Sequence, residues 1–451
     1  MTFRRGGPTA TPAGLGVWPQ ASRLKVASAR MLRSRFMAQS VKGMRDLFGA
    51  ELRWFQHIEE TARRVFGRHG YGEIRTPILE ELDVFKRSVG ESSDIVNKEM
   101  YQFTDKGGRE VVMRPENTAG VVRAAIQHKL LASSDPVLFY YIGQQFRYER
   151  MQTGRYRQFW QIGAESFGVA TPESEAESLL MLHSFLKELG LKQMVFSINS
   201  VGTPESRPAF HAAFRAFFAE RSEQFCEDCH RRLQSNPLRV LDCKNEKCQR
   251  ALEGHPVLTD FLDEASAKHH ARLKALLTEL GIPFEENPRL VRGLDYYTRT
   301  AFELLSSDLG AQSALLGGGR YDGLVKQLGG PDVPAFGWAI GLDRLAMVLQ
   351  QVRGEAPHAV PALLIPLGER AATEALKLAR SLWDAGIAVQ VETRGGTLKK
   401  AMASANRTGV QTVLILGDGE LDNGAITVKH MSTGEQESWP LGEVGARLVK
   451  S

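Results

Sequence analysis

The residues best suited to chemistry in this 451-residue chain lie in two neighbouring segments. Successive side chains of a β-strand point to opposite faces, so the odd-numbered residues of 157–165 share one face. Turn residues 151–154 connect this segment to the apolar run 138–146, which predicts an antiparallel hairpin. One face of the hairpin carries charged, amide and aromatic side chains: Arg147, Glu149, Arg157, Phe159, Gln161 and Glu165. Because buried charge is costly unless it is paired, this face suits a charged ligand with a flat ring.

Three further segments combine charged and small residues at the ends of predicted strands: 114–118, 290–300 and 337–345. The first follows a strand at 111–114 and leads into a helix that runs through Lys129, with Asn117 or Thr118 as its N-cap. In the last, the strand 336–342 runs directly into a helix at 343–349. These segments must be positioned by a strand-rich region if they are to meet the hairpin.

Together these segments resemble the motifs of histidyl-tRNA synthetases, which are class II aminoacyl-tRNA synthetases. Segment 72–80, which contains Pro77, resembles the dimer-forming first class motif. The hairpin resembles the second motif, and 337–345 resembles the third. Segments 114–118 and 291–300 resemble signatures of the histidine enzymes. The resemblance covers about residues 40–451, and five motifs in the family's order make it specific.

The resemblance implies an ATP site. Arg147 and Arg292 would grip the α-phosphate and Arg344 the far end of ATP, while Phe159 and Arg344 would enclose the adenine. Glu149 belongs to the same implied site, and Mg²⁺ would accompany ATP. Joining a carboxylate to a phosphate spreads charge over phosphate oxygens, so catalysis needs positioning and cations, and the rigid fork of arginine suits that need.

The resemblance also implies a histidine site. Glu116, Thr118 and Gln161 would bind the ammonium group of the amino acid. Glu165 and Tyr297 would bind the imidazole, with Tyr296 lining the pocket. Adjacent residues of a strand face opposite sides, so at most one of the two tyrosines should point into the site unless the backbone bulges.

Two features of these motifs stay open. Gly317–Arg320 is either a tight turn or, by the resemblance, a pocket floor that leaves room for substrate. Asp343 stands where the family more often has glutamate, and Asn117 where it often has glycine. The first departure is expected to shift a hydrogen bond or a salt bridge, and neither removes an implied ligand group.

All four cysteines lie in one stretch of charged, helical sequence: Cys226, Cys229, Cys243 and Cys248. Their spacing approximates a zinc-ribbon ligand set. The resembled family is not generally zinc-dependent, so a structural Zn²⁺ and unliganded thiols are both open.

Candidate tRNA contacts lie in two places. The hairpin turn would reach the acceptor end through Gln152 and Arg155. The C-terminal part resembles the anticodon-binding domain of synthetases and offers the basic residues Arg394, Lys399, Lys400 and Arg407. A solvated basic helix face is the alternative for each residue.

The composition of the chain indicates which residues lie outside the fold and whether a membrane partner is expected. Residues 1–40 hold seven Arg and Lys and no acidic residue, whereas the remainder holds 50 basic and 52 acidic side chains. Residues 1–39 are therefore expected to be a basic extension outside the fold: a disordered tail or upstream-start sequence in preference to a transit peptide. No apolar run reaches the length of a bilayer span, so no membrane partner and a cytoplasmic location are expected.

We expect an α+β fold whose catalytic domain, residues 40–352, is an antiparallel sheet with a helical insertion at about 203–285. Alternating strands and helices predict a C-terminal α/β anticodon-binding domain, residues 360–451. The implied activity is ATP-dependent ligation of L-histidine to its tRNA by a homodimer. The rivals are a catalytically inactive regulator of the ATP phosphoribosyltransferase type and a class II ligase for another amino acid.

Overall fold

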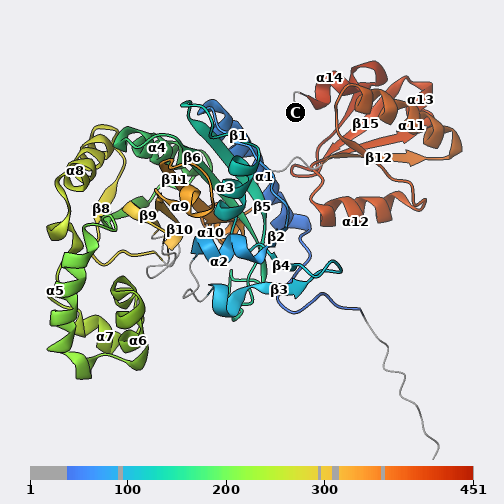
Figure 1. Ribbon diagram of the computed structural model, residues 1–451. Helices are drawn as coiled ribbons and strands as arrows, with labels where there is room; N and C mark the ends of the chain where they lie inside the picture. Colours follow the sequence, from blue (N-terminus) through green and yellow to red (C-terminus); the bar gives the residue numbers. More distant parts are fainter. Residues whose placement is uncertain (1–37, 90–94, 293–295, 307–313, 357–360, 450–451) are drawn as a thin grey trace, which may run out of the picture. The chain divides into compact units, whose positions relative to one another are not determined.

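A computed structural model describes residues 38–89, 95–292, 296–306, 314–356 and 361–449 (Figure 1). The expected N-terminal extension lies almost entirely outside these ranges, as do Gly293, Leu294 and Asp295 of the segment 290–300. None of the helices in the described ranges is both long and apolar enough to span a bilayer.

The largest sheet has eight strands in the order β1-β5-β6-β11-β10-β9-β7-β8. Neighbouring strands are antiparallel except at the two edges, where β1 pairs with β5 and β7 with β8 in parallel. The strands are β1 (Gly72–Glu73), β5 (Val137–Phe146), β6 (Gln158–Phe167), β7 (Met194–Ser200), β8 (Phe284–Glu286), β9 (Thr298–Ser306), β10 (Ala314–Arg320) and β11 (Ala335–Gly341). The predicted antiparallel sheet is confirmed.

The two faces of this sheet differ in polarity. Ile162 and Ala164 of β6 are buried in the main hydrophobic core. Because side chains alternate along a strand, Gln161 and Glu165 point to the opposite face. The hairpin of β5 and β6 is antiparallel throughout, as the sequence predicts.

Helices cover the apolar face of the sheet and complete the main core. They are α1 (Gly49–Arg68), α4 (Pro172–Glu188), α8 (Glu264–Glu279) and α10 (Leu342–Arg353). Helix α1 buries a stripe of side chains spaced as one helical face: Trp54, Phe55, Ile58, Ala62, Val65 and Phe66. Helix α10 begins directly after β11, which confirms the predicted strand-to-helix junction.

A smaller sheet has the strand order β2-β4-β3. Its strands and the adjoining short helices are β2 (Leu79–Glu81), β3 (Tyr101–Thr104), β4 (Glu110–Met113), α2 (Leu82–Val89), α3 (Thr118–Gln127), α9 (Leu324–Gln327) and the π-helix η1 (Ile95–Glu99). Asn117 is the N-cap of α3, as predicted, but its side chain makes no capping hydrogen bond. The carboxylate of Glu116 accepts hydrogen bonds from the backbone N–H groups of Thr118 and Ala119, at 2.6 and 3.0 Å.

The helical segment after β7 contains a core of its own. Its helices are α5 (Arg207–Ala219), η2 (Ser222–Gln224), α6 (Glu227–Ser235), η3 (Pro237–Val240), α7 (Glu246–Ala251) and η4 (Leu258–Phe261). Phe210, Phe214 and Phe218 pack there against cysteines and leucines. Helix α8, in contrast, buries Leu273 and Leu277 in the main core.

The C-terminal part is a five-stranded mixed sheet in the order β13-β12-β14-β15-β16. Its elements are β12 (Ala362–Leu367), α11 (Glu369–Asp384), β13 (Val389–Val391), α12 (Leu398–Thr408), β14 (Thr412–Gly417), α13 (Asp418–Asp422), β15 (Ala425–His430), β16 (Gln436–Pro440), η6 (Leu441–Glu443) and α14 (Val444–Leu448). The first three strands in the order are parallel and the other two antiparallel. The predicted α/β alternation is confirmed, whereas the final hairpin was not anticipated.

Candidate active site

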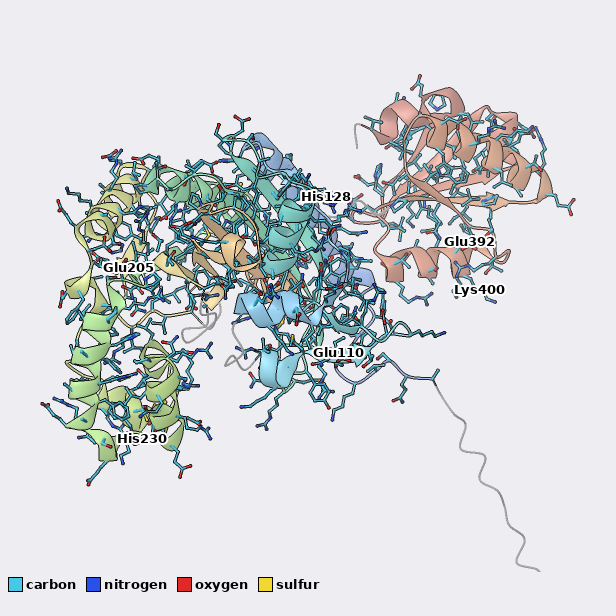
Figure 2. The ribbon with its side chains drawn as sticks, in the orientation of Figure 1. Glu110, His128, Glu205, His230, Glu392 and Lys400 are labelled. Atoms are coloured by element: carbon cyan, nitrogen blue, oxygen red, sulfur yellow. The ribbon has the colours of Figure 1, made fainter. Side chains whose placement is uncertain are left out.

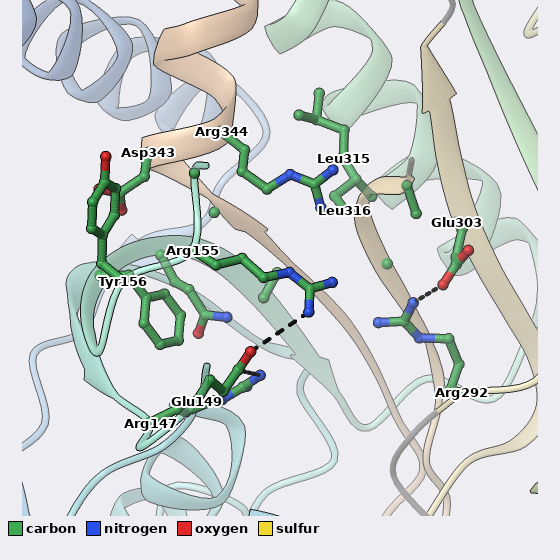
Figure 3. Close-up of a pocket in the computed structure, with 17 residues that line it drawn as sticks. Arg147, Glu149, Arg155, Tyr156, Arg292, Glu303, Leu315, Leu316, Asp343 and Arg344 are labelled. Carbon is green, nitrogen blue, oxygen red and sulfur yellow. Dashed lines mark hydrogen bonds and ion pairs between the residues drawn. The ribbon is translucent and has the colours of Figure 1, made fainter. Parts of the chain in front are cut away.

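A cavity of about 330 Å³ lies on the polar face of the large sheet. Its lining includes Arg147, Arg292 and Arg344, which come from three distant segments of the chain (Figure 3). Phe159 and Gln161 of β6 line the same cavity. Its volume is that of a small-molecule site. The three arginines and the aromatic ring therefore face a single ligand-sized space.

Glycines make the floor of this site flat. Gly317–Arg320 lie within strand β10, so the tight-turn alternative is wrong. A Cβ atom at Gly317 would overlap the guanidinium group of Arg292, and one at Gly337 would overlap the carboxylate of Glu165. The missing side chains let these two charged groups lie directly against the sheet.

The hairpin turn folds back over the cavity. Glu149 lies between two arginines, with carboxylate oxygens 3.7 Å from Nη1 of Arg147 and 3.6 Å from Nη1 of Arg155 (Figure 3). The guanidinium carbon of Arg147 is 5.3 Å from the ring centroid of Phe159. Gly154, with φ of +72°, provides the left-handed residue of the turn. Arg155, a candidate tRNA contact, therefore lines the cavity in this structure.

Two buried polar atoms at the cavity have no hydrogen-bond partner among the described residues. They are Nε of Arg292 and Oε1 of Gln161. Arg292 uses Nη1 to pair with Glu303 of β9, which also lines the cavity. An unpaired buried donor and an unpaired buried acceptor are both costly, so each is suited to a polar ligand.

A second polar cluster is centred on Glu165. Its two carboxylate oxygens accept hydrogen bonds from Thr118 Oγ1, at 2.7 Å, and from Tyr321 Oη, at 2.5 Å. Burial is the main cause that raises the pKa of Glu165 to about 8, and the nearby carboxylate of Glu116 adds to the shift. Arg147 joins the cavity to this cluster by donating from Nε to the carbonyl oxygen of Pro115, at 2.8 Å.

Tyr321 is not among the site residues predicted from the sequence. Its only signal in the sequence is its place next to the glycine run 317–319, which could be a turn or a pocket floor. Its position follows from strand β10, which runs along the floor of the site and ends at Arg320, the residue before Tyr321.

Tyr296 and Tyr297 lie close together, and neither lines the cavity of the three arginines. Both are buried, and their ring centroids are 4.8 Å apart. Strand β9 begins only at Thr298, so the alternation rule does not apply to the two tyrosines. The ring of Tyr296 is also 5.6 Å from that of Tyr321. Both tyrosines therefore belong to the cluster around Glu165.

Asp343 holds strand β6 and Arg45 in place at the edge of the cavity. One carboxylate oxygen accepts the backbone N–H of Trp160 at 2.9 Å, and the other accepts Nη2 of Arg45 at 2.5 Å. Burial raises the pKa of Asp343. Trp160 lies between Phe159 and Gln161, so the carboxylate positions the strand that presents both side chains. The hydrogen bond or salt bridge that the aspartate is expected to shift, relative to the more usual glutamate, is therefore its bond to Trp160 or its pair with Arg45.

The basic residues of the C-terminal part differ in whether they line a cavity and whether they pair with a carboxylate. A separate cavity of about 440 Å³ is lined by Arg394, Lys400 and Arg407, but not by Lys399. Arg394 pairs with Glu392, and this contact lowers the pKa of the carboxyl to about 2. Figure 2 labels Glu392 and Lys400 on this part of the chain. The four cysteines lie in the helical segment and line neither cavity.

Comparison with known proteins decides the family. The family model described as Histidyl-tRNA synthetase matches residues 43–345. The chain belongs to the histidyl-tRNA synthetase family. It is therefore a class II aminoacyl-tRNA synthetase, and a second family model, described as Anticodon binding domain, matches residues 362–451.

Individual relatives of the family support the same conclusion. The histidine–tRNA ligase of Maridesulfovibrio salexigens is 47% identical over 403 residues, which cover 89% of this chain and 97% of the relative. That of Geobacter sulfurreducens is 47% identical over 417 residues, covering 92% and 100%. The crystal structure of apo S. aureus histidyl-tRNA synthetase has a TM-score of 0.76 and 37% identity, and covers 91% of this chain and all of that one. The match to the anticodon-binding model weakens the regulator alternative, because such regulators typically lack that domain.

Proposed function

We propose that this chain ligates L-histidine to histidine tRNA through a histidyl-adenylate. In the first step the carboxylate of histidine attacks the α-phosphorus of ATP, and pyrophosphate leaves. In the second step a terminal ribose hydroxyl of the tRNA attacks the activated carbonyl carbon, and AMP leaves. The observation that carries this proposal is the convergence of Arg147, Arg292 and Arg344 on one cavity, with the buried Glu165 on the same face of strand β6 as the cavity residue Gln161.

The arginines act on the developing phosphate charge. Arg147 and Arg292 are assigned to the α-phosphate, where they stabilise the negative charge as the pentavalent centre forms. Arg344 is assigned to the far end of ATP, and Phe159 offers a face on which the adenine stacks. Arg147 and Arg292 are already held by Glu149 and Glu303, so they lose little further freedom when the phosphate arrives, and more of the binding energy is used in the transition state.

Two carboxylates fit the Mg²⁺ that accompanies ATP. Glu149 and Glu303 line the cavity, and their side chains are about a quarter exposed. In nucleotide sites Mg²⁺ is usually bound by one or two carboxylates together with oxygens of the phosphates. These two residues would hold the ion, which would shield the phosphate charge when bound.

Recognition of histidine is assigned to the cluster around Glu165. The imidazole would donate an N–H to the Glu165 carboxylate and contact Tyr297, with Tyr296 closing the pocket. The ammonium group would bind Gln161, whose Oε1 has no partner in the described part of the chain, together with Glu116 and Thr118. An analogue without matching donors would leave buried polar groups unpaired, which gives strong discrimination.

The remaining parts of the proposal concern partners and organisation. A catalytic domain over residues 40–352 carries the helical insertion at about 203–285, and residues 360–451 bind the anticodon. Two copies associate through segment 72–80, and the enzyme acts in the cytoplasm. Gln152, near the hairpin tip, is a candidate contact for the acceptor end of the tRNA.

Charging of bacterial tRNA tests the proposal. Purified protein, total tRNA and ATP are incubated with each standard amino acid in turn, and we expect acid-precipitable label with histidine alone. Arg292→Ala should lose this activity, whereas the matched control Arg272→Ala, an exposed residue of α8, should keep it. Charging with a different amino acid would refute the specificity, and no charging at all would favour the inactive regulator.

A further inference from the structure

The four cysteines converge on one point inside the helical segment. Their Sγ atoms all lie within 4.8 Å of one another. The Sγ atom of Cys226 is 3.6 Å from that of Cys229 and 3.9 Å from that of Cys243. These distances are far longer than the roughly 2.0 Å of a disulfide bond, and all four cysteines are free.

The two distances from Cys226 match those of sulfur atoms around a single small ion, and the others stay within 4.8 Å. Four ligands placed tetrahedrally at a Zn–S distance of about 2.3 Å lie about 3.8 Å from one another. An iron–sulfur cluster places several metal atoms between its cysteines and holds their sulfur atoms farther apart. We propose that the four sulfur atoms bind one Zn²⁺ ion in a closed, structural tetrathiolate site. Each thiol releases its proton on binding, so the loaded site carries a charge of −2.

Local structure supports this assignment. Cys226 precedes α6 and Cys229 lies in its first turn, whereas Cys248 lies in α7. The backbone N–H of Cys226 donates to Sγ of Cys248 at 3.2 Å, a contact that strengthens when the sulfur is a thiolate. Cys229, Cys243 and Cys248 are buried among phenylalanine and leucine side chains. Thiolate charge in such surroundings requires a compensating cation.

The proposed site also connects to the segment that carries Arg292. The side-chain amide of Gln249 donates to the carbonyl oxygen of Cys243. Its Oε1 accepts from Nη1 of Arg289 at 3.0 Å. Val291 packs against the core that holds the cysteines. A metal that fixes Cys243 therefore also braces the residues leading to Arg292, although the ion takes no part in the reaction.

Metal analysis of the wild-type chain is the first test. Full-length protein is purified under reducing conditions, incubated with ZnCl₂, desalted and analysed for zinc and iron. We expect one zinc per chain, released when a mercurial reagent titrates four thiols. Protein that keeps no zinc after desalting, or that holds iron instead, would overturn the proposal. This outcome is independent of aminoacylation, so it separates the zinc site from the proposed function.

Two variants locate the ligands. In competition with a chelator, Cys226→Ser should bind zinc more weakly than wild type by more than about tenfold, because even a supporting group next to a metal ligand contributes that much to affinity. His230→Gln is the matched control, because His230 (labelled in Figure 2) is exposed, adjoins Cys229 and is not a member of the four-cysteine cluster. Wild type and His230→Gln reconstituted with Co²⁺ should show the intense absorption of tetrahedral thiolate coordination. Equal zinc retention by Cys226→Ser, or loss in His230→Gln, would contradict the assigned ligand set.

Discussion

Substitution of Gly317 by alanine perturbs the active site without replacing any charged residue. The added Cβ would lie 2.5 Å from Nη2 of Arg292 and closer still to Nη1 and Cζ. Ordinary contacts between such atoms begin near 3.5 Å, so the guanidinium group must move by roughly 1 Å or more. It can move, because it is the far end of a flexible side chain. We therefore expect Gly317→Ala to displace Arg292 and leave the fold intact.

The expected loss of activity is large and the expected loss of stability small. A displacement of about 1 Å in a catalytic group costs about 10²-fold, and removal of one charge-stabilising donor costs about 10²–10³-fold, or about 2.7–4 kcal/mol. The broken ion pair with Glu303 is worth about 1 kcal/mol at its partial exposure. Replacing a strand glycine offsets about 0.5–1 kcal/mol of that loss. The free energy of unfolding should therefore change by less than about 1 kcal/mol.

The neighbouring glycine provides a contrast on the opposite face of the same strand. A Cβ at Gly318 would overlap the carbonyl oxygen of Gly337 and lie 2.7 Å from Cα of Trp338. These backbone atoms cannot move aside, so Gly318→Ala should destabilise the fold by about 1–3 kcal/mol or more. Denaturant unfolding and histidine-dependent ATP–pyrophosphate exchange, measured on both variants, separate the two effects.

A double-mutant cycle tests the cause. If Gly317→Ala acts by displacing Arg292, it should have little further effect on exchange in an Arg292→Ala background. Near-normal exchange in Gly317→Ala would refute the reasoning. Fully additive losses in the double variant would show that the alanine acts on some other part of the site.

Three further predictions follow from other contacts. Histidine binding at pH 7 should release close to one proton, because the pKa of Glu165 is about 8 and the imidazole N–H favours the ionised carboxylate. Calorimetry in two buffers of different ionisation enthalpy should find no proton release when histidine binds to Glu165→Gln. Equal proton release by the wild type and this variant would refute the contact between imidazole and Glu165. Asp343→Ala should lower the free energy of unfolding by about 3 kcal/mol, because it leaves Arg45 and the N–H of Trp160 without this acceptor; a loss under about 1 kcal/mol would contradict this. Lys400→Ala should weaken tRNA binding and reduce the slope of log affinity against log salt by about 1, with exchange unchanged; an unchanged slope would remove Lys400 from the interface.

Features set by periodicity were predictable from the sequence. The alternation along residues 157–165 predicts both the hairpin and its polar face, because the side-chain period of a strand is fixed by its backbone. The apolar spacing in α1 and the junction of β11 with α10 are equally local. Family motifs then supply the ATP assignments, which no local pattern contains.

Features set by tertiary contacts were not predictable. The sequence leaves the glycine run 317–319 open between a turn and a pocket floor, since its strand conformation depends on pairing with β9 and β11. Tyr321 gains its role only when that strand brings it to Glu165. Asn117 is the N-cap of α3 as expected, but the capping hydrogen bonds come from Glu116, because the chain turns so that its carboxylate meets the free N–H groups.

Amino-acid-dependent exchange of labelled pyrophosphate into ATP tests the central claim most directly. It reports formation of the adenylate and needs no tRNA, so it isolates the cavity of the three arginines and the Glu165 cluster on the same face of the sheet. Histidine alone should stimulate exchange, and Arg147→Ala, Arg292→Ala or Glu165→Gln should each reduce it strongly in folded protein. Stimulation by another amino acid, or full exchange in those variants, would contradict this account of the site.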